Sequence, residues 1–265
     1  MFITKGSLQK GYNEYIALDS PEGRLAMMDV GLLIMEAGDE YAFEEPEKET
    51  AVILLEGEAT FEWHGKSVLA SRPNPFDYDP WCIHGSRRTK ITISAVRHSE
   101  FYVQKTLNEA NFAPKMYAPA DIQTKKAGNA GELGGTMRRN IRMIFDYESV
   151  PYSNMVLGEV MNFPGLWSSY PPHWHPQPEV YFYRYDKPQG FGVGFTNGKL
   201  FETRHNGLLL ITDDCHSQVA APGYALCYVW GIRHLPGNPW QKTRIDDPAH
   251  TWMLEKDAEI WHEKD

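Results

Sequence analysis

The sequence predicts an all-β fold with two similar barrel-like domains. Short runs of β-branched and aromatic residues alternate with turn formers throughout the 265-residue chain, which contains 22 Gly, 18 Pro, 14 Tyr and 8 Trp. No stretch keeps an apolar stripe over three helical turns, so long amphipathic helices are not expected. Many short strands separated by turns are typical of sandwiches and barrels, and the length favours two domains.

The expected strands are short, are separated by turn formers and fall into two groups along the chain. The first group covers residues 32–35, 51–55, 59–63, 91–96 and 101–104. The second covers residues 155–161, 180–185, 192–195, 208–212 and 225–231. Prolines, lysines and glycines are concentrated between the groups. We therefore expect a first domain over 1–112, a linker over 113–135, and a second domain with a C-terminal tail over 136–265.

The two halves also resemble each other in the order of their features. Met35-Glu36-Ala37-Gly38 is followed by a polar turn and an apolar run, as Met161 and Gly165 are in the second half. His84 follows Pro80, and His216 lies before Pro222. This order indicates two copies of one β unit.

Composition and charge exclude several classes of protein. The formal net charge of -9 disfavours nucleic-acid binding and attraction to anionic membranes. The first twenty residues lack a hydrophobic signal core, and no apolar run approaches the ~18 residues that a bilayer span needs, so we expect a cytoplasmic protein without a membrane partner. Cys82, Cys215 and Cys227 form no Cys-x-x-Cys pair, which argues against a disulfide framework or a thiolate zinc site.

One stretch carries the residues of a candidate metal site. His173 and His175 are two apart, so on a strand both imidazoles face one side, and Glu179 has the same parity. His216 follows a later apolar run. An isolated His-x-His on a surface turn is common, but three imidazoles and a carboxylate together suit zinc, manganese, iron or nickel. These ligand types are compatible with all four metals and do not identify which one is bound.

These residues carry a resemblance to a known family. Gly165, His173-x-His175-x-x-x-Glu179, Gly190 and His216 resemble the metal motifs of the cupin superfamily. The blocks at 139–141, 167–175, 188–191 and 216–224 are similar to the bacterial 5-deoxy-glucuronate isomerases of inositol breakdown. The run 179–183 also resembles the 5-keto-4-deoxyuronate isomerases of pectin breakdown. The resemblance covers most of residues 139–250 and is much weaker before residue 108.

The resemblance implies a bicupin, with two double-stranded β-helix (jelly-roll) barrels. It implies one divalent metal per chain in the second barrel, held by His173, His175, Glu179 and His216, with zinc or manganese favoured and iron or nickel as alternatives. The first copy departs from the pattern, because residues 43–50 contain no His-x-His. We therefore expect the first barrel to be structural or to contact its neighbour, and the protein to be a homo-oligomer.

The implied reaction is an aldose–ketose isomerisation of a deoxy uronic acid, namely 5-deoxy-glucuronate to 5-dehydro-2-deoxy-gluconate. A bound metal would stabilise the charge that develops on oxygen, and another group must move a proton. The candidates for that role are Glu179, Tyr181, Tyr183 and Asp214, although a buried tyrosine can be packing and a turn aspartate can cap the backbone.

An acidic sugar substrate needs a cationic partner. Arg139 is the first candidate, because a guanidinium binds a carboxylate through two hydrogen bonds. Tyr170 and Gln189 lie in the family-like blocks and complete the predicted substrate-binding set. Arg233 and Arg184 are alternatives, although Arg184 has the opposite parity to Glu179 and should face away from the site.

Three other functions remain open at this point. The chain could isomerise another uronate, of the 5-keto-4-deoxyuronate type. It could be an iron or nickel dioxygenase, since other cupins use three histidines and a glutamate in this way. It could also be a non-catalytic sugar-binding cupin.

Overall fold

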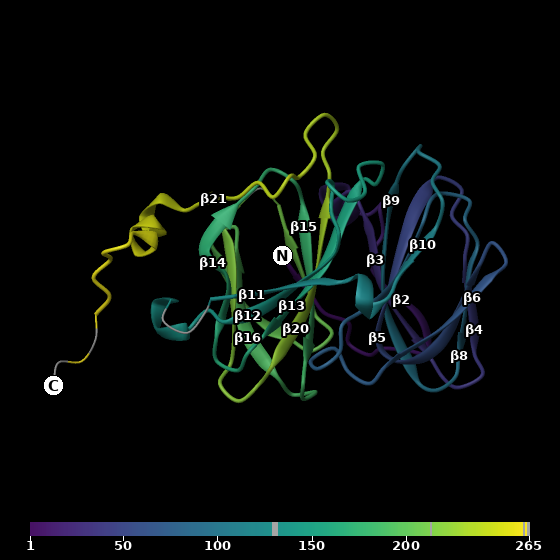
Figure 1. Ribbon diagram of the computed structural model, residues 1–265, viewed down its shortest axis with the longest axis horizontal. Coiled ribbons are helices and arrows are strands. Elements are labelled where there is room, and N and C mark those ends of the chain that lie inside the picture. The colour runs from purple at the N-terminus through teal and green to yellow at the C-terminus, as the bar shows by residue number, and fades with distance from the viewer. Residues whose placement is uncertain (129–131, 213, 262, 264–265) are drawn as a thin grey trace.

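The fold consists of two β-rich halves packed side by side, with a C-terminal segment that extends away from them (Figure 1). The computed structural model describes residues 1–128, 132–212, 214–261 and 263. Within these residues there is one α-helix, α1 (Pro21–Ala26), and the short 3-10 helices lie at Pro119–Asp121, Glu132–Gly135 and Pro248–Leu254. The prediction of an all-β fold is therefore confirmed.

The first half is a nine-stranded sheet that folds back on itself. Its main path runs β10-β7-β5-β9-β3-β2, and β4, β6 and β8 join it through β5. Its strands are β2 (Gly11–Ile16), β3 (Asp29–Met35), β4 (Glu40–Phe43), β5 (Lys48–Trp63), β6 (Lys66–Arg72), β7 (Trp81–Gly85), β8 (Ile91–Ala95), β9 (Ser99–Leu107) and β10 (Lys115–Tyr117).

Strand β5 joins what the sequence predicted as two separate strands, 51–55 and 59–63. Its first part pairs with β7 and β9, and its second part pairs with β6 and β8. Gly57 lies at the junction with φ of +116°, where a Cβ atom would be 2.2 Å from the Ser99 hydroxyl oxygen. Only glycine tolerates this conformation and this contact, so β5 can bend from one layer into the next without ending.

The second half contains two sheets. The seven-stranded sheet has the order β1-β18-β15-β20-β13-β12-β11, and the five-stranded sheet has the order β17-β16-β19-β14-β21. The strands are β1 (Phe2–Ile3), β11 (Gln123–Ala127), β12 (Arg139–Phe145), β13 (Met155–Asn162), β14 (Trp167–Trp174), β15 (Glu179–Tyr185), β16 (Phe191–Thr196), β17 (Lys199–Arg204), β18 (Leu208–Ile211), β19 (His216–Ala220), β20 (Leu226–Arg233) and β21 (Ile245–Asp246).

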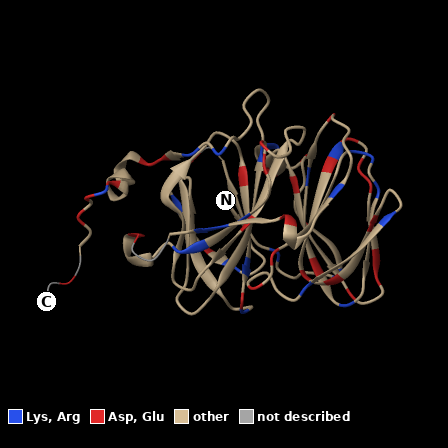
Figure 2. Cartoon of the chain, viewed as in Figure 1, with Lys and Arg blue, Asp and Glu red and all other residues tan. Residues whose placement is uncertain are grey.

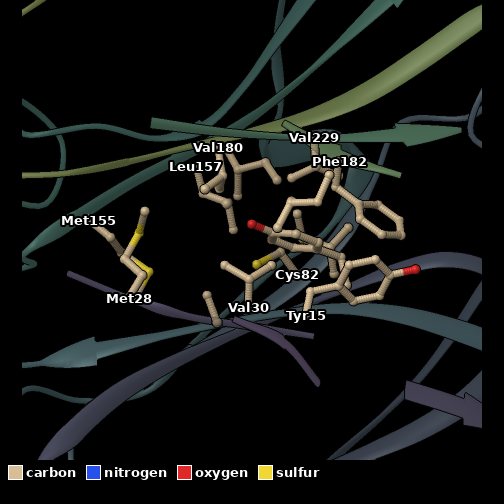
Figure 3. Close-up of a cluster of buried hydrophobic side chains, with 14 of the residues drawn as sticks. Tyr15, Met28, Val30, Cys82, Met155, Leu157, Val180, Phe182 and Val229 are labelled. Atoms are coloured by element: carbon tan, nitrogen blue, oxygen red, sulfur yellow. The ribbon is translucent and has the colours of Figure 1, made fainter. Parts of the chain in front are cut away.

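The seven-stranded sheet has a core on each face. Strand β15 shows the alternation: Tyr181 and Tyr183 belong to the core of the second half, whereas Val180 and Phe182 belong to a core shared with the first half. Figure 3 shows this shared core, in which Tyr15, Met28, Val30 and Cys82 meet Met155, Leu157, Val180, Phe182 and Val229. The sheet is therefore buried on both sides, which explains why all seven residues of β15 are buried.

Strands near the predicted boundaries connect the halves. The N-terminal strand β1 pairs with β18 of the second half. Within the predicted linker 113–135, β10 pairs with β7 and β11 pairs with β12, and residues 129–131 lie outside the described residues. The division at 112 and 136 therefore remains our proposal, with a connecting segment that contributes a strand to each half.

His84, which the sequence left without metal-binding partners, contributes to the contact between the halves. Its Nε2 lies 2.9 Å from a Glu49 carboxylate oxygen, and both side chains are buried. Glu49 also accepts hydrogen bonds from the Ser153 hydroxyl and the Asn154 backbone N–H of the second half, at 3.0 and 2.6 Å. The pair thus ties β5 and β7 to the segment that leads into β13.

The charged residues do not form separate acidic and basic halves. Figure 2 shows Lys and Arg interspersed with Asp and Glu along the strands and loops of both halves. Among the described residues, no helix is long and apolar enough to cross a membrane.

Candidate metal centre

The predicted ligands meet at one end of the second half, where its two sheets face each other. His173 on β14 lies directly opposite His216 on β19 in the five-stranded sheet, and His175 follows two residues later. Glu179 is the first residue of β15 in the seven-stranded sheet. Each sheet therefore contributes ligands to a single point.

Three of the four predicted ligands form a compact group. The Nε2 atoms of His175 and His216 each lie 3.2 Å from Oε2 of Glu179, and one ligand atom from each of the three residues lies within 4.8 Å of the others. All three side chains are buried. His173 lies beside this group, with its ring centroid 4.4 Å from that of His216. The geometry allows His173 to be a fourth ligand but does not bring it into the compact group.

The hydrogen bonds of the histidines leave the same nitrogen available on each ring. Nδ1 of His173 donates to the Pro171 carbonyl at 3.3 Å, and Nδ1 of His175 donates to the Gln177 carbonyl at 2.9 Å. Nδ1 of His216 donates to the Asp214 carbonyl at 3.1 Å. A carbonyl can only accept, so Nδ1 carries a proton on each ring and Nε2 is the nitrogen that faces the site, as in histidines that bind metals.

The convergent atoms are not satisfied by the protein alone. Nε2 of His216 is buried and has no hydrogen-bond partner among the described residues, although it lies 3.2 Å from the Glu179 carboxylate. Two imidazole nitrogens that face one buried carboxylate oxygen need a cation between them, which is a proton or a metal ion. The residues therefore fit a divalent metal ion, which this donor set binds in proteins.

The pKa values agree with ligation. Burial alone would raise the pKa of Glu179, but its contacts with His175 and His216 lower that pKa to about 2. Burial, together with the nearby His216 and Arg244, lowers the pKa of His173 to about 2. At neutral pH the carboxylate is therefore ionised and the His173 imidazole is neutral, which are the forms that bind a metal.

A second group of possible ligands, Glu56, His98 and Glu100, lies on the first half. The guanidinium of Arg184 contacts both glutamates of this group, with 3.2 Å between Nη2 and Glu56 Oε1. A cation already neutralises these carboxylates, so the group has the features of a salt bridge. Arg184 also confirms the parity argument, since it faces the first half.

A pocket of about 210 Å³ opens beside the compact ligand group. Tyr181 lines it, and its hydroxyl lies 2.9 Å from the Ser169 hydroxyl. Burial and the nearby Glu179 raise the pKa of Tyr181 well above its ordinary value, so this hydroxyl keeps its proton at neutral pH. The Tyr228 hydroxyl lies 2.6 Å from that of Ser168 in the same wall.

Arg139 lines the same pocket, as the sequence predicted for the substrate-binding cation. It is 9% exposed, and its side chain donates to the Met137 carbonyl at 2.8 Å. Among the described residues no carboxylate forms an ion pair with it. Burial lowers the pKa of Arg139, so an anion in the pocket would compensate a buried and unpaired cation. The alternative, Arg233, instead donates to the Thr106 hydroxyl of the first half at 2.7 Å.

Two predicted catalytic side chains are not brought to the pocket wall. Tyr183 lies two residues deeper along β15 than Tyr181, and its buried hydroxyl has no partner among the described residues. The Asp214 carboxylate accepts the Cys215 backbone N–H at 2.6 Å. Asp214 therefore orients His216 through its carbonyl, while its side chain caps the turn; Asp213 lies outside the described residues.

Two predicted substrate-binding residues also lie away from the pocket. Gln189 is exposed in the turn after β15, and the seven residues of β15 carry the chain about 20 Å from Glu179. Tyr170 is half-buried, and its ring packs on Trp167 with centroids 5.3 Å apart. Neither belongs to the pocket lining.

The pocket also contains residues that the sequence analysis did not find. Trp240, Lys242 and Arg244 come from the segment between β20 and β21, which passes over the pocket because β21 pairs with β14 beside His173. The Trp240 ring lies 6.3 Å from that of His175. A two-residue strand gives no periodic signal in a sequence, so this placement could not be predicted.

Comparison with known proteins decides the family. The KduI/IolB family matches residues 2–253, almost the whole chain. The chain is a member of the KduI/IolB family. Its curated relatives in this family include the 5-deoxy-glucuronate isomerase of Bacillus licheniformis, 23% identical over 88% of this chain and 89% of the relative. The 5-deoxy-glucuronate isomerase of Listeria monocytogenes serotype 4a is 27% identical over 94% of this chain and 98% of the relative.

Solved structures show the fold of this KduI/IolB family member. An IolB-like protein from Salmonella typhimurium LT2 has a TM-score of 0.85 at 17% identity, covering 96% of this chain and 99% of that one. A cupin 2 conserved barrel domain protein from Leptotrichia buccalis has a TM-score of 0.50 at 12% identity, covering 87% and 92%. These likenesses confirm the predicted cupin-type jelly-roll barrels.

Proposed function

We propose that this protein is a metal-dependent isomerase that converts 5-deoxy-glucuronate to 5-dehydro-2-deoxy-gluconate. Family membership and the names of the curated relatives support an isomerase of a sugar acid. The observation that carries the proposal is one pocket that contains both the convergent histidine and glutamate ligands and the unpaired Arg139. The end with the metal ligands suits a carbonyl group, and the end with Arg139 suits a carboxylate.

The reaction is an internal redox exchange that needs no other reactant. The C–H bond at the carbon beside the aldehyde breaks, a proton is added to the aldehyde carbon, and a hydroxyl proton moves from one oxygen to the other. A divalent metal held by His175, Glu179 and His216, with His173 beside them, would act as a Lewis acid that stabilises the negative charge on these oxygens.

The chain's own residues supply the binding and the proton positions. Arg139 holds the substrate carboxylate through its guanidinium. Tyr181 keeps its proton and is placed to donate it to a substrate oxygen, with its hydroxyl oriented by Ser169. Glu179 is the one carboxylate among the described residues of the pocket lining, and we assign the proton-accepting role to it when it is released from the metal, since a ligated carboxylate is a poorer base.

The proposal is tested by incubating the metal-loaded protein with 5-deoxy-glucuronate, glucuronate and 5-keto-4-deoxyuronate. We expect ketose formation from 5-deoxy-glucuronate, followed by proton NMR, and no oxygen uptake in an iron-loaded sample. Turnover of only the 5-keto-4-deoxyuronate would assign the other reaction of the family. Tight binding of all three compounds without turnover would indicate a sugar-binding protein instead.

Replacing Arg139 by methionine should weaken substrate binding more than it slows the chemical step. The side chain keeps its apolar stem but loses the charge, so we expect KM for 5-deoxy-glucuronate to rise by about 10–100-fold, which corresponds to the loss of one charge-assisted pair. Arg139→Lys should recover part of the affinity. An unchanged KM with a reduced kcat would contradict a carboxylate-binding role.

The proposal also covers the metal, the location, the assembly state and the partners of the protein. We propose zinc or manganese as the metal, with iron and nickel to be compared by metal analysis of the purified protein. We propose that the protein acts in the cytoplasm, and that it forms a homo-oligomer, which light scattering would test. Its substrate is a small sugar acid, and neither nucleic acid nor membrane is a partner.

A further inference from the structure

One wall of the pocket is an apolar strip made by Ile141, Met143, Val160 and Trp230. These side chains come from three neighbouring strands, β12, β13 and β20, and they lie at matching levels. Ile141 is opposite Val160, while Met143 and Trp230 are both opposite Gly158. The strip is therefore continuous across the sheet.

The absence of a side chain at position 158 shapes this strip. A Cβ atom on Gly158 would lie 2.6 Å from two carbon atoms of the Trp230 indole. The indole therefore covers Gly158, where any other residue would displace the ring. The result is an apolar wall whose one polar group among the described residues is the buried, unpaired Nε1 of Trp230.

The apolar strip lies between the two groups that would hold a sugar acid by its ends. Glu179 is on β15, next to β20, and Arg139 is on β12. Three strand spacings, or about 14 Å, separate β15 from β12. Arg139 also lies six residues further along the strands, since it is opposite Asn162 of β13 whereas Glu179 is at the level of Val156. Both side chains line the pocket, so they approach it from diagonal corners of the sheet. A ligand that contacts both ends must lie along the strip.

The hydroxyl groups of the pocket lie where its two sheets face each other, and Tyr228 stands beside the strip, on β20 opposite Val160. Ser168 and Ser169 come from β14 in the facing sheet, and their hydroxyls pair with those of Tyr228 and Tyr181. A ligand in this pocket can therefore form hydrogen bonds along one edge while its other edge meets hydrocarbon. Hydroxyl groups on that second edge would lose water without gaining a partner.

We propose that Ile141 and Met143 make the pocket selective for a uronate that lacks a hydroxyl on the carbon next to its carboxylate. Arg139, Ile141 and Met143 occupy alternate positions of β12 and share one face. The carbon attached to a carboxylate held by Arg139 therefore contacts Ile141 first and Met143 next. This inference rests on the proposed function, since it assumes that Arg139 binds the substrate carboxylate.

The test compares 5-deoxy-glucuronate with glucuronate, which differs by the hydroxyl on that carbon. We expect the protein to prefer the deoxy compound by about 100-fold in kcat/KM, since apolar pockets reject an added hydroxyl by about this factor. Ile141→Thr and Met143→Gln, which introduce polar groups at similar size, should each reduce this preference by about tenfold. Ile141→Val, which stays apolar, should retain it. Leu200→Thr, at a 76% exposed position on β17, is the control outside the pocket.

Calorimetric Kd values for both compounds separate this inference from the proposed function. No turnover of 5-deoxy-glucuronate with preferential binding of it would refute the proposed reaction and support the selectivity. Equal binding of the two compounds by the unaltered protein would overturn the inference, even if turnover were observed. Preferences that stay unchanged in both Ile141→Thr and Met143→Gln, with normal metal content and circular dichroism, would also overturn it.

Discussion

Replacing His175 and His216 together by alanine should remove the bound metal and lower turnover by at least about a thousandfold. Both imidazoles place Nε2 within 3.2 Å of the Glu179 carboxylate, and each is fixed by a hydrogen bond from Nδ1 to a backbone carbonyl. A Lewis acid contributes several kcal/mol to such reactions, and each 1.36 kcal/mol corresponds to a factor of ten. Metal content by plasma emission spectroscopy and kcat with 5-deoxy-glucuronate measure the two effects.

The comparison variants separate metal loss from unfolding. Glu179→Gln keeps the size of the side chain but removes its charge, and we expect it to weaken metal binding as well. His64→Asn changes a histidine in an exposed turn of the first half, where φ of +45° suits asparagine, and it should retain metal and activity. Full turnover in the metal-free double variant, with an unchanged circular dichroism spectrum, would refute the proposed metal centre.

The ligand group could be predicted from the sequence because its signals are local. His173, His175 and Glu179 share one strand parity, and in the structure they lie at the same end of the second half. The same rule placed Arg184 on the opposite face. It did not show that the first half buries that face, because packing between distant strands leaves no periodic mark.

Proximity in sequence did not correspond to proximity in space for one predicted substrate-binding residue. Gln189 lies close to Glu179 along the chain, but a strand of seven residues carries it to the far end of the sheet. The apolar strip shows the converse. Ile141 on β12 and Trp230 on β20 flank the same strand, β13, yet they are 89 positions apart in the sequence. Only the pairing register of β12, β13 and β20 reveals the wall that they share.

A buried ion pair joins the two halves and is the second site at which we expect a large effect. Arg72 on β6 donates to both carboxylate oxygens of Glu159 on β13, at 2.9 and 2.6 Å, and both side chains are fully buried. Arg72 also donates to the backbone carbonyls of Leu54 and Tyr78. Burial alone would lower the pKa of Arg72, but the adjacent Glu159 carboxylate raises it, so the pair is ionised.

Glu159→Gln should lower the free energy of unfolding by about 3–5 kcal/mol, because it leaves the Arg72 cation buried without its counter-charge. Urea denaturation followed by circular dichroism measures this change. Arg142, whose Nη1 lies 3.5 Å from the same carboxylate, would lose part of its compensation too. Glu202→Gln, which affects an ion pair that is about half exposed, is the matched control and should change stability by no more than about 0.5 kcal/mol.

The double variant Arg72→Met with Glu159→Leu separates the value of the pair from the cost of an unpaired charge. Replacing a buried pair by apolar residues of similar volume is often neutral, so this variant should be more stable than Glu159→Gln although it loses more hydrogen bonds. If it is as unstable as the single variant, the loss reflects the contacts between the halves and not the uncompensated cation. Because Arg72 and Glu159 lie on different halves, an unfolding curve with two steps in Glu159→Gln would further show that the pair couples their unfolding.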